Sequence, residues 1–383
     1  MIDFNELRGR GYTVQWYLTD IAKYLALWGI SQAAATHGFT YVLGGGTALN
    51  DLYFPRSRRR FSRDLDLYFL SVESSKFLKY VNACLKDSGY FREIDVVGEG
   101  VVVQGLTYEG VRRSNAVYRF RIALPPDVHA GLKLTDVLPY SVKGRAGFDE
   151  WYLRSKGGLP RIYQVEVTVF RGVRRNANPV EVIEYELPVI DMPCWMDLPP
   201  PYAVTVFSLE DLIANKVEAV ISGLTAKGLL EGEVTGRRTV KVRDVYDLVV
   251  AFLHKLYDKD KLFASLDALN IDVKYAAKAI RLAMLQTIID PNKHRELTEI
   301  VPSLKGDLPG WVSMVLEAYE GTMDLCGPTP EDYLARKAVL GEKVDIDEVI
   351  SVFNISRPQA THVLSKLERY GFLTRPSRNR RSR

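Results

Sequence analysis

The spacing of apolar residues changes along the chain and predicts helices and strands in a definite order. Apolar side chains recur at three- and four-residue intervals over 13–29, which is typical of a helix, and a second helix is expected over 74–85. From 91 to 170 apolar and polar residues alternate, and the clearest strands are expected over 101–103, 116–122 and 162–169. The segment 125–160, rich in Pro, Gly and Lys, is expected to be a loop insertion. We therefore predict a mixed sheet with flanking helices over residues 1–190.

A helical pattern dominates the second half of the chain. Prolines cluster over 188–201 and mark a boundary, because consecutive prolines fit neither a helix nor an interior strand. Ser208 is expected to cap the first helix beyond them, and Gly223 is expected to end it. The expected helices cover 208–222, 240–255, 261–269, 273–289 and 310–319. The fold class is therefore α+β, with a helical domain over 202–325.

The composition is that of an ordinary globular protein, with 47% hydrophobic and 26% charged residues. No apolar run is long enough to cross a bilayer, and the N-terminus lacks the pattern of a signal peptide, so a cytoplasmic location is expected. The three cysteines are too far apart for a zinc motif or a disulfide framework and are expected to be buried free thiols. The net charge is only +4, but basic residues cluster at 56–63, at 171–175 and after Arg375, where an anionic partner is expected.

Two carboxylates stand two residues apart at the centre of the strongest candidate site. Asp64 and Asp66 alternate with Leu65 and Leu67, so a strand there would project both carboxylates from one face and bury the leucines. Like charges held so close are costly unless a cation lies between them, and a hard divalent cation such as Mg²⁺ or Mn²⁺ is the expected occupant. The alternative is a solvated strand face without catalytic function.

Three glycines precede this strand. Gly44, Gly45 and Gly46 follow an apolar run and lead into Thr47 and Ala48, a pattern that predicts a strand, a tight turn and the start of a helix. Backbone N–H groups at such a helix start can approach a phosphate. An ordinary turn is the alternative, but the glycine turn followed by the Asp-x-Asp pair is far more specific than either feature alone.

The two motifs together resemble the polymerase-β-type nucleotidyltransferases, and within them the AbiEii-type toxins of abortive-infection toxin–antitoxin systems. The resemblance is carried by Gly45-Gly46-Thr47-Ala48-Leu49 and Arg60-Phe61-Ser62-Arg63-Asp64-Leu65-Asp66. It implies transfer of a nucleoside monophosphate from an NTP to an acceptor hydroxyl, with a tRNA 3′ end as the favoured acceptor and an antitoxin protein as partner. The residues expected to contact the nucleotide are Gly45, Gly46, Thr47, Arg60, Ser62 and Lys216. Relatives often carry lysine where this chain has Gly44, so that contact is expected to be missing or supplied by the arginines of 56–63.

A third carboxylate is expected on a strand beside the Asp-x-Asp pair. Two metal ions must be bridged in this class of enzyme to activate the acceptor hydroxyl and to neutralise the leaving pyrophosphate. Glu166 is the best candidate, because it lies among β-branched residues of an expected strand. Asp127 and Asp136 are the substitutes, and a solvent-facing glutamate is the alternative reading of Glu166.

Two further helices carry residues that the resemblance assigns to the site. AbiEii-like proteins have an Ala-x-Lys-x-x-Ala helix, present here around Lys216, and a second helix with paired aspartates, present here as Asp244 and Asp247. The resemblance implies that Lys216 clamps the triphosphate and that Asp244 is a catalytic acid supported by Asp247. The alternatives are a lysine that snorkels at the edge of the core and a surface ion pair between Arg243 and Asp247.

The tail over 331–383 is set apart by Gly327-Pro328-Thr329-Pro330 and is similar to a winged helix-turn-helix. A turn near Asn354 is expected between two helices, the second capped by Ser356. Nucleic-acid binding is favoured over protein docking because polar and basic side chains remain on the outer face. The expected nucleic-acid contacts are Gln359, Thr361, His362, Ser365, Arg369, Arg375, Arg378, Arg380 and Arg381.

Two other functions compete with an RNA nucleotidyltransferase. A sugar-nucleotide glycosyltransferase also uses Asp-x-Asp with a divalent metal, but the glycine turn upstream argues against it. A DNA-binding regulator with a degenerate, ligand-sensing transferase domain is the non-enzyme alternative. Metal-dependent incorporation of a labelled NTP separates the three.

Overall fold

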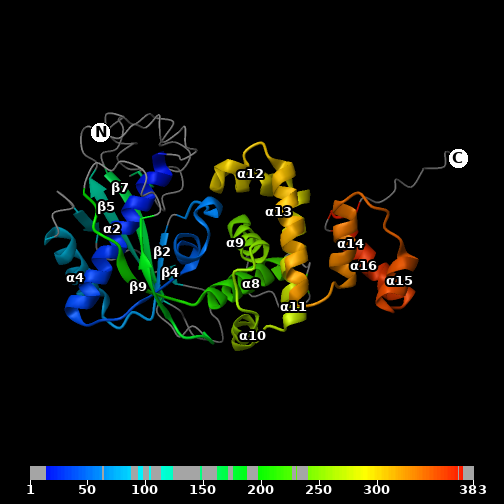
Figure 1. Ribbon diagram of the computed structural model, residues 1–383, viewed down its shortest axis with the longest axis horizontal. Helices are drawn as coiled ribbons and strands as arrows, with labels where there is room; N and C mark the ends of the chain where they lie inside the picture. The colour runs from blue at the N-terminus through cyan, green and yellow to red at the C-terminus, as the bar shows by residue number, and fades with distance from the viewer. Residues whose placement is uncertain are drawn as a thin grey trace. The chain divides into compact units, whose positions relative to one another are not determined.

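We describe a computed structural model of the chain (Figure 1). Close contacts divide the chain into two compact units. The first comprises Met1–Arg175 with Pro179–Leu212, and the second comprises Asn176–Asn178 with Ile213–Arg383. The structure describes residues 14–62, 64–87, 94–97, 103–104, 114–123, 147–148, 162–170, 176–187, 197–226, 230, 240–369 and 371–373.

A mixed sheet forms the centre of the first unit. Its described strands follow the order β3-β5-β7-β2-β1-β9-β8, with β4 paired to β5 and β6 paired to β7. β2 runs parallel to β7 and β1 runs parallel to β9, whereas the other pairs are antiparallel. The strands are β1 (Val42–Gly44), β2 (Asp64–Tyr68), β3 (Ile94–Val97), β4 (Val103–Gln104), β5 (Ser114–Ala123), β6 (Gly147–Phe148), β7 (Ile162–Phe170), β8 (Glu181–Tyr185) and β9 (Tyr202–Val206).

Two long helices cover this sheet. α2 (Val14–His37) packs on α4 (Ser74–Asp87) and on β7, and Figure 1 shows it running across the strands. The predicted helix over 13–29 continues to His37, and Ile30 and Ala33 of the added part are also buried. It ends at Gly38, whose φ of +67° lies in the left-handed region that favours glycine.

The mixed sheet with flanking helices confirms the predicted α+β class. The strands expected over 116–122 and 162–169 are present and slightly longer. The strand expected over 101–103 is described only at Val103–Gln104, and the loop insertion expected over 125–160 lies outside the described residues apart from 147–148. The sequence did not reveal β8 or β9. Since β9 pairs with β1, the sheet continues past the prolines, and the chain does not turn helical until Leu209.

The second unit is helical. Ser208 caps its first helix, α8, as predicted, since the Asp211 backbone N–H donates to Ser208 Oγ at 3.2 Å. Gly223 does not end this helix, which continues to Ala226; an added Cβ at Gly223 would lie 2.7 Å from the Val240 nitrogen, so this glycine permits close packing instead. The sequence missed α12. The helices are α8 (Leu209–Ala226), α9 (Val242–Leu253), α10 (Lys259–Ala268), α11 (Val273–Ile289), α12 (Pro291–Ile300) and α13 (Leu308–Gly321), with short 3₁₀ turns η3 (Pro302–Leu304) and η4 (Thr322–Asp324).

Three helices follow near the C-terminus, namely α14 (Pro330–Val339), α15 (Ile346–Phe353) and α16 (Arg357–Arg369). α14 packs against α11 through Arg281, whose guanidinium is buried and lies 3.3 Å from Asp332. Burial of Asp332 raises its pKa, although Arg281 opposes the shift. The range predicted as a separate module therefore shares a buried ion pair with α11. Beyond α16 only residues 371–373 are described, so the wing stays a prediction.

Among the described helices, none combines the length and the apolar character needed to cross a membrane. Cys84 and Cys326 are free thiols, as expected, although both are half-buried and not fully enclosed. Cys194 lies outside the described residues.

Candidate active site

Asp64 and Asp66 occupy alternate positions of β2. Both are partly exposed, whereas Leu65 and Leu67 between and beyond them are completely buried. This alternation arises because successive strand side chains point to opposite faces. The two carboxylates therefore share the face of the sheet that the leucines do not occupy, as the sequence predicted.

The neighbouring strand β7 brings Glu166 into register with this pair. Parallel pairing of β2 with β7 sets Asp64 opposite Glu166 and Asp66 opposite Thr168. Paired residues of adjacent strands occupy the same face of a sheet, so position 166 belongs to the face of Asp64 and Asp66. Among the side chains that the structure describes, no group of three His, Cys, Asp or Glu is placed to hold a metal ion. Glu166 is assigned to the candidate site only because of its position in the strand register. Asp127 and Asp136, the alternative third carboxylates, lie outside the described residues.

The glycine turn lies directly against Asp66. Gly44 pairs with Asp66 across the antiparallel β1–β2 ladder, and Gly45 has a φ of +69°. An added Cβ at Gly45 would lie 2.0 Å from Asp66 Oδ2. Glycine is therefore required here twice, once for the left-handed backbone and once for the approach of the carboxylate. Gly46 is similarly close to Arg60, because an added Cβ would lie 2.6 Å from Arg60 Nη2.

A short helical segment begins at this turn and is tied to β2. It consists of α3 (Gly45–Ala48) followed by one π-helical turn, η1 (Leu49–Tyr53). Thr47 Oγ1 donates to the Asp64 carbonyl at 2.6 Å and contacts Ser62 Oγ at 3.1 Å, and both side chains are buried. These bonds hold the turn against the strand that carries the carboxylates. A direct contact of Thr47 or Ser62 with a nucleotide stays a prediction.

Arg60 points into the protein, although the sequence suggested a nucleotide contact. Its guanidinium is buried and donates to the Phe61 carbonyl at 3.0 Å. Its backbone N–H donates to Asn50 Oδ1 at 2.9 Å, and Asn50 in turn donates to the Gly46 carbonyl at 2.8 Å. Arg60 and Asn50 thus connect the loop after η2 (Arg56–Arg58) to the glycine turn. The nucleotide contact of Arg60 also stays a prediction.

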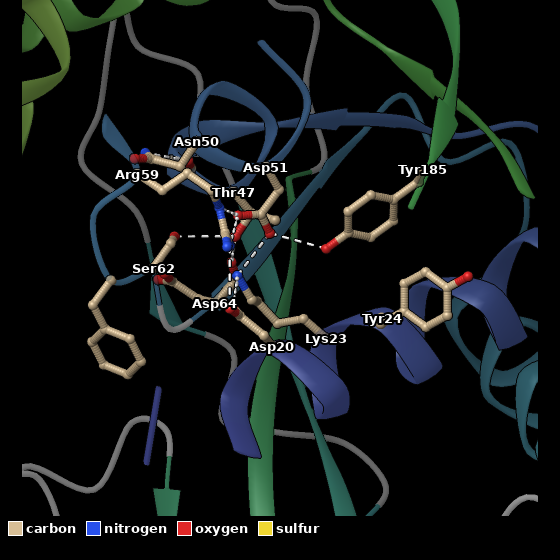
Figure 2. A network of polar contacts seen from close by, with 12 residues as sticks. Asp20, Lys23, Tyr24, Thr47, Asn50, Asp51, Arg59, Ser62, Asp64 and Tyr185 are labelled. Carbon is tan, nitrogen blue, oxygen red and sulfur yellow. Dashed lines mark hydrogen bonds and ion pairs between the residues drawn. The ribbon is translucent and has the colours of Figure 1, made fainter. Parts of the chain in front are cut away.

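A buried charge network, which the sequence did not reveal, anchors the far end of the same helical segment. It contains Asp20 and Lys23 from α2, Asp51 from η1, Arg59 from the following loop and Tyr185 from β8 (Figure 2). Lys23 Nζ lies 2.8 Å from Asp51 and 3.1 Å from Asp20. Arg59 Nη2 lies 2.5 Å from Asp51 and 3.2 Å from Asp20, and Tyr185 donates to Asp51 at 2.9 Å. Two cations thus neutralise two carboxylates in the core.

Burial and ion pairing have opposite effects on the pKa values of Asp51 and Arg59. Burial alone would raise the pKa of Asp51, but the charges of Arg59 and Lys23 outweigh it and lower that pKa to about 2. Asp20 and Asp51 raise the pKa of Arg59 in spite of its burial. Burial, with the negative charge of Asp51 nearby, raises the pKa of Tyr185 far above its usual value. Asp51 and Arg59 therefore keep their charges at neutral pH, and Tyr185 stays protonated and able to donate.

A second charge cluster lies in the helical unit. Lys216 on α8 binds Asp244 at 2.7 Å and Asp247 at 2.9 Å, both on α9. Asp247 is buried and Arg243 is exposed, so the alternative of an Arg243–Asp247 surface pair is wrong. Lys216 does not snorkel to solvent either, because its ammonium lies between two carboxylates. The part that Lys216 and Asp244 take in catalysis stays a prediction.

The residues predicted to contact nucleic acid are exposed at each position that the structure describes. Thr361, His362, Ser365 and Arg369 are exposed on α16. Gln359 is exposed as well, but its Oε1 accepts from both Ser356 N and Ser356 Oγ at 2.8 Å, so it completes the cap of α16. The four predicted contacts Arg375, Arg378, Arg380 and Arg381 lie outside the described residues.

Comparison with known proteins identifies the family. The family model described as nucleotidyl transferase AbiEii toxin, type IV toxin–antitoxin system, matches residues 25–137 and 139–325. Among solved structures, the nucleotidyltransferase toxin MenT4 of Mycobacterium tuberculosis H37Rv is similar at 16% sequence identity, over 95% of this chain and 97% of that chain, with a TM-score of 0.39. Comparison with curated proteins gives no match. The matched residues include the glycine turn, the Asp-x-Asp strand and the Lys216 and Asp244 helices, and the chain belongs to the AbiEii family of nucleotidyltransferase toxins.

Proposed function

We propose that this nucleotidyltransferase toxin uses a divalent metal ion, Mg²⁺ or Mn²⁺, to transfer a nucleoside monophosphate from an NTP to an RNA, with a tRNA 3′ end as the favoured acceptor. The observation that carries the proposal is the placement of Asp64 and Asp66 on one face of β2, with the glycine turn against Asp66. The acceptor itself rests on the resemblance to the AbiEii family.

The residues at β2 suit a hard cation. Asp64 and Asp66 offer carboxylate oxygens, which Mg²⁺ and Mn²⁺ prefer, and they are half-buried on one face of the strand. Two carboxylates so close repel each other unless positive charge compensates them. Asp64, Asp66 and the register neighbour Glu166 would hold the ion. When bound, such an ion stabilises negative charge on the transferring phosphoryl group and favours deprotonation of the acceptor hydroxyl.

The protein's own groups then bind and orient the nucleotide. The turn at Gly45 and Gly46 is packed against Asp66 and Arg60, and we assign its backbone N–H groups to the nucleotide phosphates, as the family motifs imply. The hydrogen bond from Thr47 to the Asp64 carbonyl keeps this turn and the carboxylates in a fixed relation. We assign Lys216 to binding of the triphosphate and Asp244 to turnover, as the family motifs imply. The neutralising partner in the cell would be an antitoxin protein.

The competing functions predict different results in one transfer assay. The full-length protein is incubated with each radiolabelled NTP, with Mg²⁺ or Mn²⁺, and with total RNA, and the labelled products are separated by size. We expect label in RNA of tRNA length with one or a few of the four NTPs. Label in sugar or protein products would favour another transferase, and the absence of any product under all conditions would favour the regulator with a degenerate domain.

Variants at the carboxylates test the site itself. Asp64→Asn and Asp66→Asn should each lower transfer at least about 100-fold, because each removes charge stabilisation worth several kcal/mol at the transition state. Asp197→Asn removes a carboxylate from an exposed position of the same unit and serves as the matched control. Thermal unfolding should be nearly unchanged, since the two aspartates are partly exposed. Full activity in either variant, or transfer that persists in excess EDTA, would contradict the proposal.

A further inference from the structure

α15 and α16 form a helix-turn-helix. Asp345 caps α15, and α15 ends at Asn354, whose φ of +50° is left-handed. Ser356 then opens α16, and its backbone N–H and its hydroxyl both donate to Gln359 Oε1. The turn of three residues, 354–356, thus lies between the left-handed Asn354 and Ser356, which opens α16. This is the turn length that DNA-binding helix-turn-helix motifs use.

One side of α16 is buried against neighbouring helices. Ala360, Val363 and Leu367 are buried, and α16 contacts both α14 and α15. Val349 of α15 and Phe372, just after α16, are also buried. These apolar side chains fix the rotation of α16 about its own axis. The side that faces away from them is therefore presented to solvent in a defined orientation.

The opposite side of α16 carries an exposed polar stripe, which we define as Pro358, Thr361, His362, Ser365 and Arg369. At 100° per residue these five positions cluster on the side directly opposite the three buried ones. The stripe contains no carboxylate and no Leu, Ile, Val, Met, Phe, Tyr or Trp side chain. Protein-docking helices present apolar anchors, whereas base edges are read by hydroxyl, imidazole and guanidinium groups.

The charge of the sequence from α16 onward favours a polyanion as partner. Between Arg357 and Arg383 the sequence has eight Lys or Arg residues and a single acid, Glu368. The acidic residues of neighbouring α15 are already paired, because Asp347 binds Arg357 and Glu348 binds Lys337 at 2.6 Å. Such a basic segment neutralises phosphates and releases counterions.

The helix-turn-helix packs against the helical unit through specific contacts of α14 with α11. Arg281 of α11 binds Asp332 of α14 at 3.3 Å, and it also donates to the Gly327 carbonyl at 2.9 Å. Lys278 binds Glu331 at 2.6 Å beside it. α14 in turn packs against α16. A ligand held by α16 would therefore be held firmly to α11.

We propose that the polar stripe of α16 binds duplex DNA in the major groove. α16 has 13 residues and is therefore about 20 Å long. B-form DNA has a major groove about 12 Å wide, which admits such a helix, whereas the major groove of A-form RNA is too narrow for side chains to read. This second binding activity does not depend on the transfer reaction.

Binding by the full-length protein tests the proposal. Fluorescence anisotropy is measured with a labelled 30-base-pair random DNA duplex, an RNA duplex of the same sequence, and a single strand, at several salt concentrations. The wild-type protein should prefer duplex DNA, and its affinity should fall steeply with salt. Ser365→Glu and Arg369→Glu place negative charge in the stripe and should weaken DNA binding about 5- to 100-fold. Lys305→Glu, at an exposed position before α13, is the charge-reversal control and should bind normally.

The results separate the possible partners. Weakened DNA binding in both stripe variants, with unchanged nucleotidyl transfer and thermal unfolding, would support the proposal. Equal affinity for duplex RNA and duplex DNA would overturn it in favour of RNA. DNA binding that neither variant changes, or the absence of DNA binding together with a stripe-dependent interaction with a protein, would overturn it as well.

Discussion

Replacing Arg59 with Met tests the buried charge network. The Arg59 side chain is only 3% exposed and bridges Asp20 and Asp51, which are both fully buried. Met retains much of the volume but leaves two carboxylates with Lys23 as the remaining cation of the network. Removing one partner of a buried ion pair costs about 3–5 kcal/mol. For a unit of roughly 200 residues this corresponds to a fall in Tm of about 6–20 °C.

Arg56→Met is the matched control. Arg56 lies three residues earlier and has one ion pair, with Glu186 at 3.0 Å, but its side chain is 57% exposed. An exposed pair contributes at most about 1 kcal/mol, so the same substitution should change Tm by only a few degrees. Unfolding is followed by near-UV circular dichroism and urea titration, with separate transitions fitted for the two units. Similar Tm values for Arg56→Met and Arg59→Met would refute the reasoning.

The pH dependence gives an independent check. The pKa of Asp51 is lowered to about 2 in the folded protein, so its contribution to stability is fully present above pH about 4 and is lost as the pH falls through about 2. Without Arg59 that pKa should rise, because burial then acts with less opposition. The difference in free energy of unfolding between wild type and Arg59→Met should therefore be smaller at pH 4 than at pH 7. Adding Asp51→Asn to Arg59→Met should destabilise less than the two single changes summed.

Two further substitutions have matched controls within the chain. Gly45→Ala should abolish transfer, because its Cβ would meet the Asp66 carboxylate. Gly38 has a similar φ of +67° with nothing within 4 Å, so Gly38→Ala should cost about 1–2 kcal/mol of stability but no activity. Measured kcat and Tm values of both variants test this prediction, and an active Gly45→Ala would contradict it. Lys216→Met should destabilise the helical unit by about 3–5 kcal/mol and raise the KM for NTP, whereas Lys255→Met, which breaks an exposed 2.7 Å pair with Asp324, should do neither. Equal urea midpoints for the two lysine variants would contradict this.

The local geometry of the site was predictable because it depends on short-range rules. Alternation along a strand places Asp64 and Asp66 on one face, and a glycine after an apolar strand permits the positive φ of Gly45. The pattern of β-branched residues around Glu166 indicated a strand, but not its pairing with β2. The family motifs supplied that expectation. Sequence patterns also indicated the cap at Ser208, which depends on residues three apart.

The charge network was not predictable, because its members come from four separate segments. Asp20 and Lys23 are the only Asp, Glu, Lys or Arg residues of α2, which is the signal that could have drawn attention to them. Arg59 belongs to a cluster of arginines that the sequence suggested for phosphate binding, and its inward direction follows from the position of Asp51. Clustered basic residues thus do not by themselves indicate a surface for anions. β8 and β9 were missed for a similar reason, since the prolines before β9 hid its pairing with β1.

The network and the glycine turn act on the same short helical segment from opposite ends. Residues 45–53 begin at the turn that touches Asp66 and continue without a break into η1, which carries Asp51. One end is fixed by Thr47, which binds the Asp64 carbonyl, and the other end is fixed by Lys23 and Arg59. A shift of the segment along its axis would break both sets of contacts at once. Although none of the network charges is assigned a step in the reaction, they therefore determine where the turn stands relative to Asp64 and Asp66, the carboxylates to which we assign the metal ion.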